Sequence, residues 1–466
     1  MKIGKNIFRG ALAFSLLVTG FLTSCGTATP LSKGAGSAYY ENNIGDFFEA
    51  KLSNGIPVVF KRNSGSQIAV VRLLIEGGVP FVKYEKGGLE GITLDLMIHG
   101  SQKYSYQKIQ RIEYEKSCSI SASASKDYSV VGMNCIKRDF FDVLDVYADS
   151  ILNPLFLDKD FNQNMKIIRE NFVSNFADPS GRLGYAISSS VFKNHPYAST
   201  TSVNEKSVNN IVLSDVKNHH KGLLNASRMK FVIVGNFSTD EESSILLKLN
   251  EYFGGIESGE YVRPEIPEIQ LDNRTVYVEC ESAGEIGYIE GIFKCPERAS
   301  EDYIPFVLAS MYVDDSLFKI LREKNSALYS VGTGVVGARK LVGAVSLYKV
   351  SKSEGVKDMV LEAISDFPSS EKEVKARLDA YKNKYITSIF ESSQNASGIA
   401  GQVIGSLVYR DSATEYLYRT SQVHDVSAAD VLAAYEKYFA PLVKKSPSQI
   451  KWIVLTGKGN TEKFEF

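Results

Sequence analysis

The side chains best suited to metal or acid–base chemistry are five histidines, and their spacing does not build a site. His219 and His220 are adjacent, so they point to different sides of a helix. His195 stands in a His-Pro-Tyr turn, and we expect no ligand partner near His99 or His424. A catalytic zinc needs three protein ligands that converge on one point. The histidines therefore predict no metal centre, and no G-x-S-x-G segment supplies a nucleophile instead.

The cysteines beyond residue 25 offer no redox or metal chemistry of their own. None has the C-x-x-C spacing of a thiol redox centre or a zinc site. Strands over residues 119–124 and 130–134, joined by a Lys-Asp turn, would place the first cysteine opposite the second. This register allows a cross-strand disulfide, and the alternative is two buried thiols, which fits the poor turn-forming pair better. The four cysteines are Cys118, Cys135, Cys280 and Cys295.

A second chemical signal comes from residues 88–101, with the sequence GLEGITLDLMIHGS. The segment follows residues 69–78, whose near-continuous apolar run predicts a buried strand. Leu89, Ile92 and Leu96 recur at helical spacing, so the segment is expected to form a helix with one face against a core. A strand that leads directly into an amphipathic helix can present side chains of that helix rigidly.

The helix resembles the active-site helix of the pitrilysin/insulinase family of inverzincin metallopeptidases, which reads G-x-A-H-x-x-E-H-M-x-x-x-G-[ST]. Gly88, Gly100 and Ser101 fit this pattern without a gap, and Leu96 replaces its Met. The fit sets the register of every position between them. In the family, two imidazoles at i and i+4 bind zinc and the carboxylate beside them deprotonates the bound water.

In this register the family's zinc-site positions carry other residues. Gly91 stands at the first His, Leu94 at the general-base Glu and Asp95 at the second His. The third ligand is a Glu in a helix similar to E-R-x-V-V-x-x-E, and Asn171 takes its place. Glu170 beside it points about 100° away around the helix. Since only Asp95 retains a carboxylate, we expect no zinc cofactor and no peptidase activity from the chain alone.

The resemblance covers nearly all of the chain beyond its N-terminal segment. The further matching segments occur in the family's order: residues 52–60, an opening strand with an Asn-Gly turn; 153–156, NPLF after a long helix over 139–152; 178–179, Asp-Pro; 195–197, His-Pro-Tyr; 228–236, RMKFVIVGN; and 315–324 with 328–330, similar to S-R-L-F-x-x-L-R-E-x-x-x-L-A-Y-S.

The two halves of the chain repeat one order of elements. The first half runs from a strand ending at residues 76–78 through two helices to the strand pair near residues 119–135. The second half runs from a strand at 290–293 through helices at 303–311 and 315–324 to strands at 327–334 and 342–349. The repeat and the resemblance predict an α+β fold of two homologous pitrilysin-like α/β sandwich domains. Each has an antiparallel-rich sheet with helices on one side, and together they form half of a clamshell.

Composition places the boundaries of these domains. Residues 254–273 combine glycines and prolines with many charges and predict a linker. The N-terminal peptidase-like domain then covers residues 46–253, with the degenerate zinc motif, and the C-terminal one covers 274–466.

The N-terminus predicts a lipoprotein signal peptide over residues 1–24. A basic start precedes an apolar run over residues 11–22 that is short for a bilayer span, and Leu-Thr-Ser-Cys follows directly as a lipobox. Cys25 would carry the lipid and residues 25–45 would form a tether. The chain is expected in the bacterial cell envelope, and Gly26 is compatible with the outer membrane. The alternative is an ordinary cleaved signal with a chance cysteine.

Charge excludes one class of partner. The chain has 53 basic and 54 acidic residues, a formal net charge of −1. Nothing therefore indicates nucleic-acid binding or a polybasic membrane contact.

The resemblance implies a protein partner. The family's peptidases enclose a chamber between four homologous domains, so a two-domain chain needs a second chain. Ligand-less subunits pair with H-x-x-E-H subunits and keep an Arg and a Tyr that contact substrate backbone. Arg322 and Tyr329 match those positions and their spacing of seven. The alternative is that Arg322 stabilises its helix C-terminus and Tyr329 packs at a strand edge.

The sequence thus predicts a non-catalytic, lipid-anchored subunit that pairs with an active zinc-peptidase subunit and helps bind unfolded peptide. A second hypothesis is a structural or peptide-binding lipoprotein without an enzyme partner. A third, which the missing ligands disfavour, is an autonomous zinc metalloendopeptidase.

Overall fold

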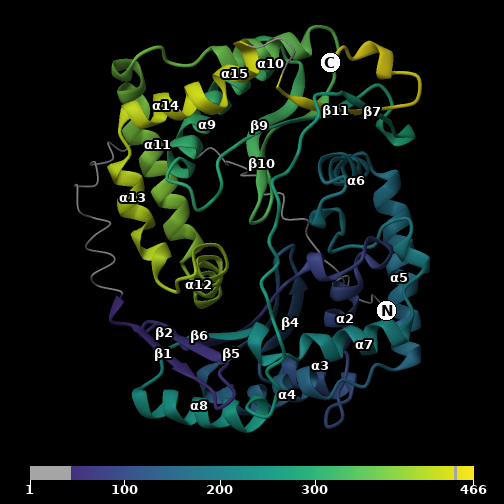
Figure 1. The fold of residues 1–466 in the computed structure, drawn as a ribbon, viewed down its shortest axis with the longest axis vertical. Coiled ribbons are helices and arrows are strands. Elements are labelled where there is room, and N and C mark those ends of the chain that lie inside the picture. The colour runs from purple at the N-terminus through teal and green to yellow at the C-terminus, as the bar shows by residue number, and fades with distance from the viewer. Residues whose placement is uncertain (1–43, 445–448) are drawn as a thin grey trace.

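The structure is a computed structural model that describes residues 44–444 and 449–466 (Figure 1). The predicted signal peptide, Cys25 and nearly all of the predicted tether lie outside the described residues. Within the described ranges, no helix combines the length and the apolar character needed to cross a membrane.

The first half of the chain forms a six-stranded sheet in the order β1-β2-β6-β3-β5-β4. β2 and β6 run parallel, and the other neighbours are antiparallel. Its elements are β1 Phe47–Lys51, β2 Pro57–Arg62, β3 Ile68–Glu76, α2 Leu89–Met97, α3 Tyr106–Glu115, β4 Ser119–Ala124, β5 Tyr128–Ile136, α4 Phe140–Leu152, α5 Asp158–Ala177, α6 Pro179–Val191, α7 Leu213–Leu223, β6 Met229–Gly235 and α8 Thr239–Phe253.

The second half forms a five-stranded sheet in the order β7-β11-β8-β10-β9. Its elements are β7 Val276–Glu279, β8 Gly287–Phe293, α9 Tyr303–Leu317, a π-helix Phe318–Lys324, β9 Leu328–Gly337, β10 Leu341–Val350, α10 Val356–Ser365, α11 Glu371–Ser392, α12 Ala396–Arg410, α13 Arg419–Asp425, α14 Ala428–Tyr438, α15 Ala440–Lys444 and β11 Lys451–Thr456.

The two sheets confirm the internal repeat. If β2 is matched with β7, β6 with β11, β3 with β8, β5 with β10 and β4 with β9, the strand orders coincide and only β1 is extra. The matched pairs also share direction, because β11 pairs parallel with β7 as β6 does with β2. One detail of the prediction is wrong: the two separate helices expected at 303–311 and 315–324 are one continuous run, in which α9 passes into the π-helix.

The hairpin of β4 and β5 has the expected register, with Ile120 opposite Met133 and Ala122 opposite Val131. Cys118 and Cys135 are free thiols. The Cys118 thiol faces the carbonyl oxygen of Ile112 at 3.7 Å. Burial raises the pKa of Cys135 to about 12. The structure therefore agrees with the alternative of two thiols.

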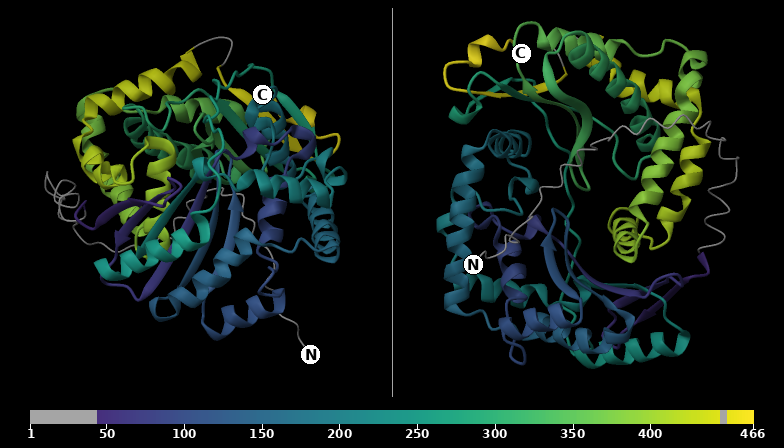
Figure 2. Two further views of the ribbon diagram at one scale, coloured as in Figure 1. Left: turned by 60° about the horizontal axis from the view of Figure 1, so that its bottom comes forward. Right: turned by 180° about the vertical axis from the view of Figure 1, so that it is seen from behind.

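Each sheet packs its own helices on one face, and a helix of the other domain covers the opposite face. α12 lies on β3 and β6 of the first sheet, and α6 lies on β8 and β11 of the second. Figure 1 and the rear view in Figure 2 both show this exchange. The fold prediction mentioned helices on one side only, because a sequence pattern does not tell which element of another domain covers a strand face.

The segment between α8 and β7, residues 254–275, includes the predicted linker and is called the linker from here on. It contains no helix or strand, yet it is not fully exposed to solvent. Ile266 and Ile269 are buried in the same apolar cluster as α6. His195 Nε2 lies 2.9 Å from the carbonyl oxygen of Pro267. The linker is thus an ordered segment that packs against both domains.

Candidate functional site

The helix that carries the degenerate motif is held tightly. β3 ends at Glu76, Gly77 and Gly78 turn the chain at positive φ, and Gly88 precedes α2 at φ 85°. Glycine adopts this left-handed conformation without a steric penalty. Leu89, Ile92 and Leu96 are buried as predicted, and α2 packs on α7, β4 and α5.

Two of the four zinc-site positions carry no side chain that could bind a metal ion. Leu94 is 1% exposed and belongs to the main core of the first domain. A Cβ atom at Gly91 would lie 3.0 Å from the carbonyl oxygen of Thr201, so a larger residue needs the 201 backbone to shift. Gly91 and Leu94 therefore provide no lone pair where the family has His and Glu.

The carboxylate of Asp95 is already bound to α5. The side-chain amide of Asn164 donates a hydrogen bond to Asp95 Oδ2. His99 Nδ1 stands 3.9 Å from the same oxygen and 2.7 Å from the Asp95 carbonyl oxygen. Burial raises the pKa of Asp95. Asn171, the predicted third position, lies almost two turns further along α5 and is exposed.

These residues do not fit zinc. Gly91, Leu94, Asp95 and Asn171 offer one carboxylate and one amide between them, and the carboxylate has a neutral hydrogen-bond partner. Zinc in proteins requires several nitrogen, sulfur or carboxylate ligands in tetrahedral geometry. In addition, the described residues contain no group of three or more His, Cys, Asp or Glu side chains placed to hold a metal ion.

A buried polar cluster that sequence reasoning missed lies beside this helix. Glu90 accepts a hydrogen bond from the hydroxyl of Ser129, and its other oxygen lies 3.4 Å from His219 Nε2. The sequence made no prediction about a carboxylate near His219. The expectation of no ligand partner near His99 is wrong, because Asp95 Oδ2 lies 3.9 Å from its Nδ1. The one sign of this cluster in the sequence is Glu90, a charged residue in an otherwise apolar stretch of the helix. A tertiary contact between α2 and α7 decides its partner.

Arg322 and Tyr329 come together on the surface of the second domain. The Arg322 guanidinium lies 5.6 Å from the Tyr329 ring centroid and 5.1 Å from that of Phe318. Tyr329 is 63% exposed on the edge strand β9, and Arg322 is exposed on the π-helix. A cation over an exposed aromatic ring leaves the guanidinium N–H groups and the phenol free to meet another molecule.

Comparison with known families agrees with these observations. Residues 57–204 match the family described as Insulinase (Peptidase family M16), and residues 210–385 match the Peptidase M16 inactive domain. The chain belongs to peptidase family M16.

Solved structures share the fold of this M16 chain at low sequence identity. A peptidase M16 inactive domain from Pseudomonas fluorescens is 17% identical, with a TM-score of 0.75 over 88% of this chain and 98% of that one. A protease from Helicobacter pylori is 15% identical, with a TM-score of 0.75 over 88% and 99%. The periplasmic protease PqqL from Escherichia coli is 14% identical, with a TM-score of 0.73, and this chain spans 49% of its length.

Proposed function

We propose that this chain is a non-catalytic M16 subunit that pairs with an active zinc-peptidase subunit and helps hold unfolded peptide in a shared chamber. The observation that carries the proposal is a contrast between two sites. The zinc-site positions lack a set of ligands that could bind zinc, whereas Arg322 and Tyr329 are adjacent and exposed. A chain that retains only the second site can bind a peptide but needs another subunit for hydrolysis.

The proposed chemistry of the second site is backbone recognition. Arg322 would donate charge-assisted hydrogen bonds to peptide carbonyl oxygens, and the hydroxyl of Tyr329 would add one more. Such contacts do not depend on side-chain identity, which suits a chamber for unfolded peptides. We further propose that the lipid on Cys25 anchors the pair in the cell envelope.

The test begins with the partner. Affinity purification of the full chain from native membranes should recover a second M16 subunit with an intact H-x-x-E-H motif. Recovery of no peptidase subunit would instead favour a structural or peptide-binding lipoprotein without an enzyme partner.

The second step measures peptide turnover by the reconstituted pair. Arg322→Ala should lower turnover roughly ten- to a hundredfold, and Tyr329→Phe about fivefold, because about 1.5 to 3 and about 1 kcal/mol of hydrogen bonding are lost. Lys319→Ala on the same π-helix is the matched control and should retain full activity. Full activity of Arg322→Ala would leave Arg322 and Tyr329 as a packed surface pair, and loss of assembly would favour the structural role.

A further inference from the structure

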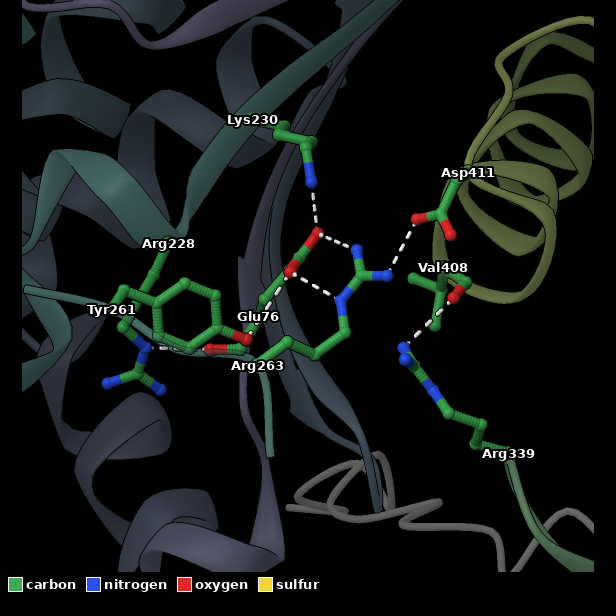
Figure 3. Close-up of polar contacts among 8 residues, drawn as sticks. All are labelled: Glu76, Arg228, Lys230, Tyr261, Arg263, Arg339, Val408 and Asp411. Carbon is green, nitrogen blue, oxygen red and sulfur yellow. Dashed lines mark hydrogen bonds and ion pairs between the residues drawn. The ribbon is translucent and has the colours of Figure 1, made fainter. Parts of the chain in front are cut away.

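Three segments far apart in the sequence meet at the carboxylate of Glu76, the last residue of β3 (Figure 3). This carboxylate is buried and binds Lys230 on the neighbouring strand β6. From the linker, Arg263 donates through Nε at 3.2 Å and through Nη2 at 3.1 Å, and the hydroxyl of Tyr261 donates at 3.3 Å. Arg228 donates to the main-chain oxygen of the same residue at 2.7 Å. The first domain therefore holds the linker by one acidic side chain.

Arg263 extends this contact to the second domain. Its Nη1 donates to Asp411 Oδ1 at 2.7 Å, and Asp411 is the C-cap of α12 with φ 54°. Arg339, in the turn between β9 and β10, donates to the carbonyl oxygen of Val408 at 3.0 Å. Both arginines lie at the C-terminal end of α12, where a helix presents unpaired carbonyl groups and partial negative charge. That end is thus fixed by two cations (Figure 3).

The opposite end of α12 has a polar contact of its own. Arg72 on β3 donates to the hydroxyl of Ser397 at 3.2 Å and to Asn134 Oδ1 at 2.8 Å. Between the two ends, the contact of α12 with the first sheet is apolar. Its buried part consists of small and aliphatic side chains: Ala396, Ala400, Val403, Ile404 and Val408 of α12 against Val59, Val70, Leu74, Val232 and Val234 of the sheet. Tyr409 of α12 adds an edge-to-face ring contact with Tyr128 of β5.

These two kinds of contact do different things. Apolar burial contributes most of the attraction between the domains, but it depends on the area removed from water and has no direction of its own. A buried carboxylate with fixed donors is directional, because any other placement leaves charges desolvated and unpaired. The ionic contacts that run from Glu76 through Arg263 to Asp411 therefore favour one arrangement, and so does the hydrogen bond from the Arg339 main-chain N–H to Asp127 Oδ2 at 2.7 Å. The apolar face supplies the free energy of association.

We propose that Arg263 is a pin that fixes α12, and with it the second domain, in one register on the first sheet. The linker arginine does this by bridging Glu76 and Asp411, the ends of elements from the two domains. Without the bridge the domains remain associated through the apolar face but sample a wider range of relative positions. The pin acts within one chain, so its test needs no partner subunit and stands apart from the proposed function.

The test uses two variants of the full chain, Asp411→Asn and Arg263→Met. Asn adopts the left-handed conformation as readily as Asp, so Asp411→Asn removes the charge without straining the C-cap. Its site is also 69% exposed at the side chain, so folding is preserved. Hydrogen exchange should become about two- to fivefold faster in α12 and in the linker, the scale of one lost, largely exposed ion pair, while Tm shifts by no more than about 2 °C.

Arg274→Met is the matched control, because Arg274 is a linker arginine whose ion pair stays within the linker, to Asp272. It should leave exchange in α12 unchanged. Faster exchange confined to α12 and the linker in either pin variant supports the proposal. Unchanged exchange overturns it, and so does exchange that rises uniformly with a large fall in Tm, because Arg263 would then be an ordinary stabilising contact. If Arg263→Met does not fold, Asp411→Asn decides alone.

Discussion

At the scale of single residues, a position can keep its place in a motif and lose its chemistry through its neighbours. Asp95 is the only zinc-site position with a carboxylate, yet its oxygen is bound by Asn164. Gly91 faces a main-chain oxygen of the 201 segment, and Leu94 is part of a core. The helix of the motif is present, but its side chains no longer include the ligands that zinc requires.

This arrangement predicts the outcome of zinc loading. Purified protein equilibrated with excess zinc and then dialysed should retain well under one equivalent at α2 by elemental analysis, because one engaged carboxylate is not a site. Asp95→Asn is the matched variant and should retain the same amount. Stoichiometric zinc that disappears in Asp95→Asn would contradict the prediction.

A second prediction concerns Glu290 on β8. Because every second residue of a strand points to the same face, Glu290 shares its face with Tyr288 and Ile292, which pack in the cluster of α6. It is 1% exposed, and its carboxylate accepts a hydrogen bond from the hydroxyl of Ser346 at 2.9 Å. Burial raises its pKa from the usual 4.5 to about 7. The folded protein thus keeps a proton that the unfolded chain releases, so stability is lost as pH rises from about 4.5 through about 7.

Glu290→Gln removes this titration. The variant should be more stable than the parent at pH 8 by about 1 to 3 kcal/mol and should show little or no advantage at pH 4. Urea denaturation at both pH values measures the difference. Glu285→Gln, at an exposed ion pair with Lys463, should show no comparable pH dependence. Equal effects at both pH values would mean that Glu290 does not titrate on folding.

At the scale of elements, a hydrogen bond joins the two helices that carry the zinc-site positions, α2 and α5. In the family a metal joins α2 to α5, whereas here the hydrogen bond from Asn164 to Asp95 does so. The two domains also differ in their helices. α2 and α3 are separate in the first domain, whereas α9 and the π-helix form one continuous run in the second. Hydrophobic periodicity locates a helix, but it does not decide whether two helical segments join.

Loss of the new link should loosen α2. Asn164→Ala should lower the free energy of unfolding by about 1.5 kcal/mol, the lower end for a hydrogen bond to a charged group, because Asp95 is only partly buried. Asn162→Ala, at an exposed position of the same helix, is the control and should change it by less than about 0.5 kcal/mol. A chelator should alter neither protein. Equal losses in both variants would show that Asn164 matters only as a helix residue.

At the scale of the whole molecule, the two domains form one unit because each lends a helix to the other's sheet. α12 packs on the first sheet and α6 on the second, and the linker packs in the same cluster as α6. This unit has the fold of M16 chains, and it covers 49% of the length of PqqL.

The predicted lipid on Cys25 would determine where the whole molecule is located in the cell. A Cys25→Ala variant should lose lipid labelling and move to the soluble fraction, because the thiol of Cys25 is the proposed attachment point of the lipid. Fractionation after a high-salt wash measures this, with Cys118→Ala as the control that should stay anchored. A Cys25→Ala protein that remains in washed membranes would contradict the lipobox.

The sequence by itself determined the family, the two-domain repeat, the central strands of both sheets, the helix after β3, and the register of the β4–β5 hairpin. These features follow from local order: apolar periodicity, turn residues and motif spacing survive at low identity because they maintain the core. Only the tertiary structure decided which residues meet. The partners of Asp95, of Glu90 and of Arg263 come from distant segments, and a charged residue in a sequence carries no record of its distant partner. The linker shows the same limit: its glycines, prolines and charges are typical of a flexible tether, yet Ile266 and Arg263 bind it between the domains because both surfaces are complete only after folding.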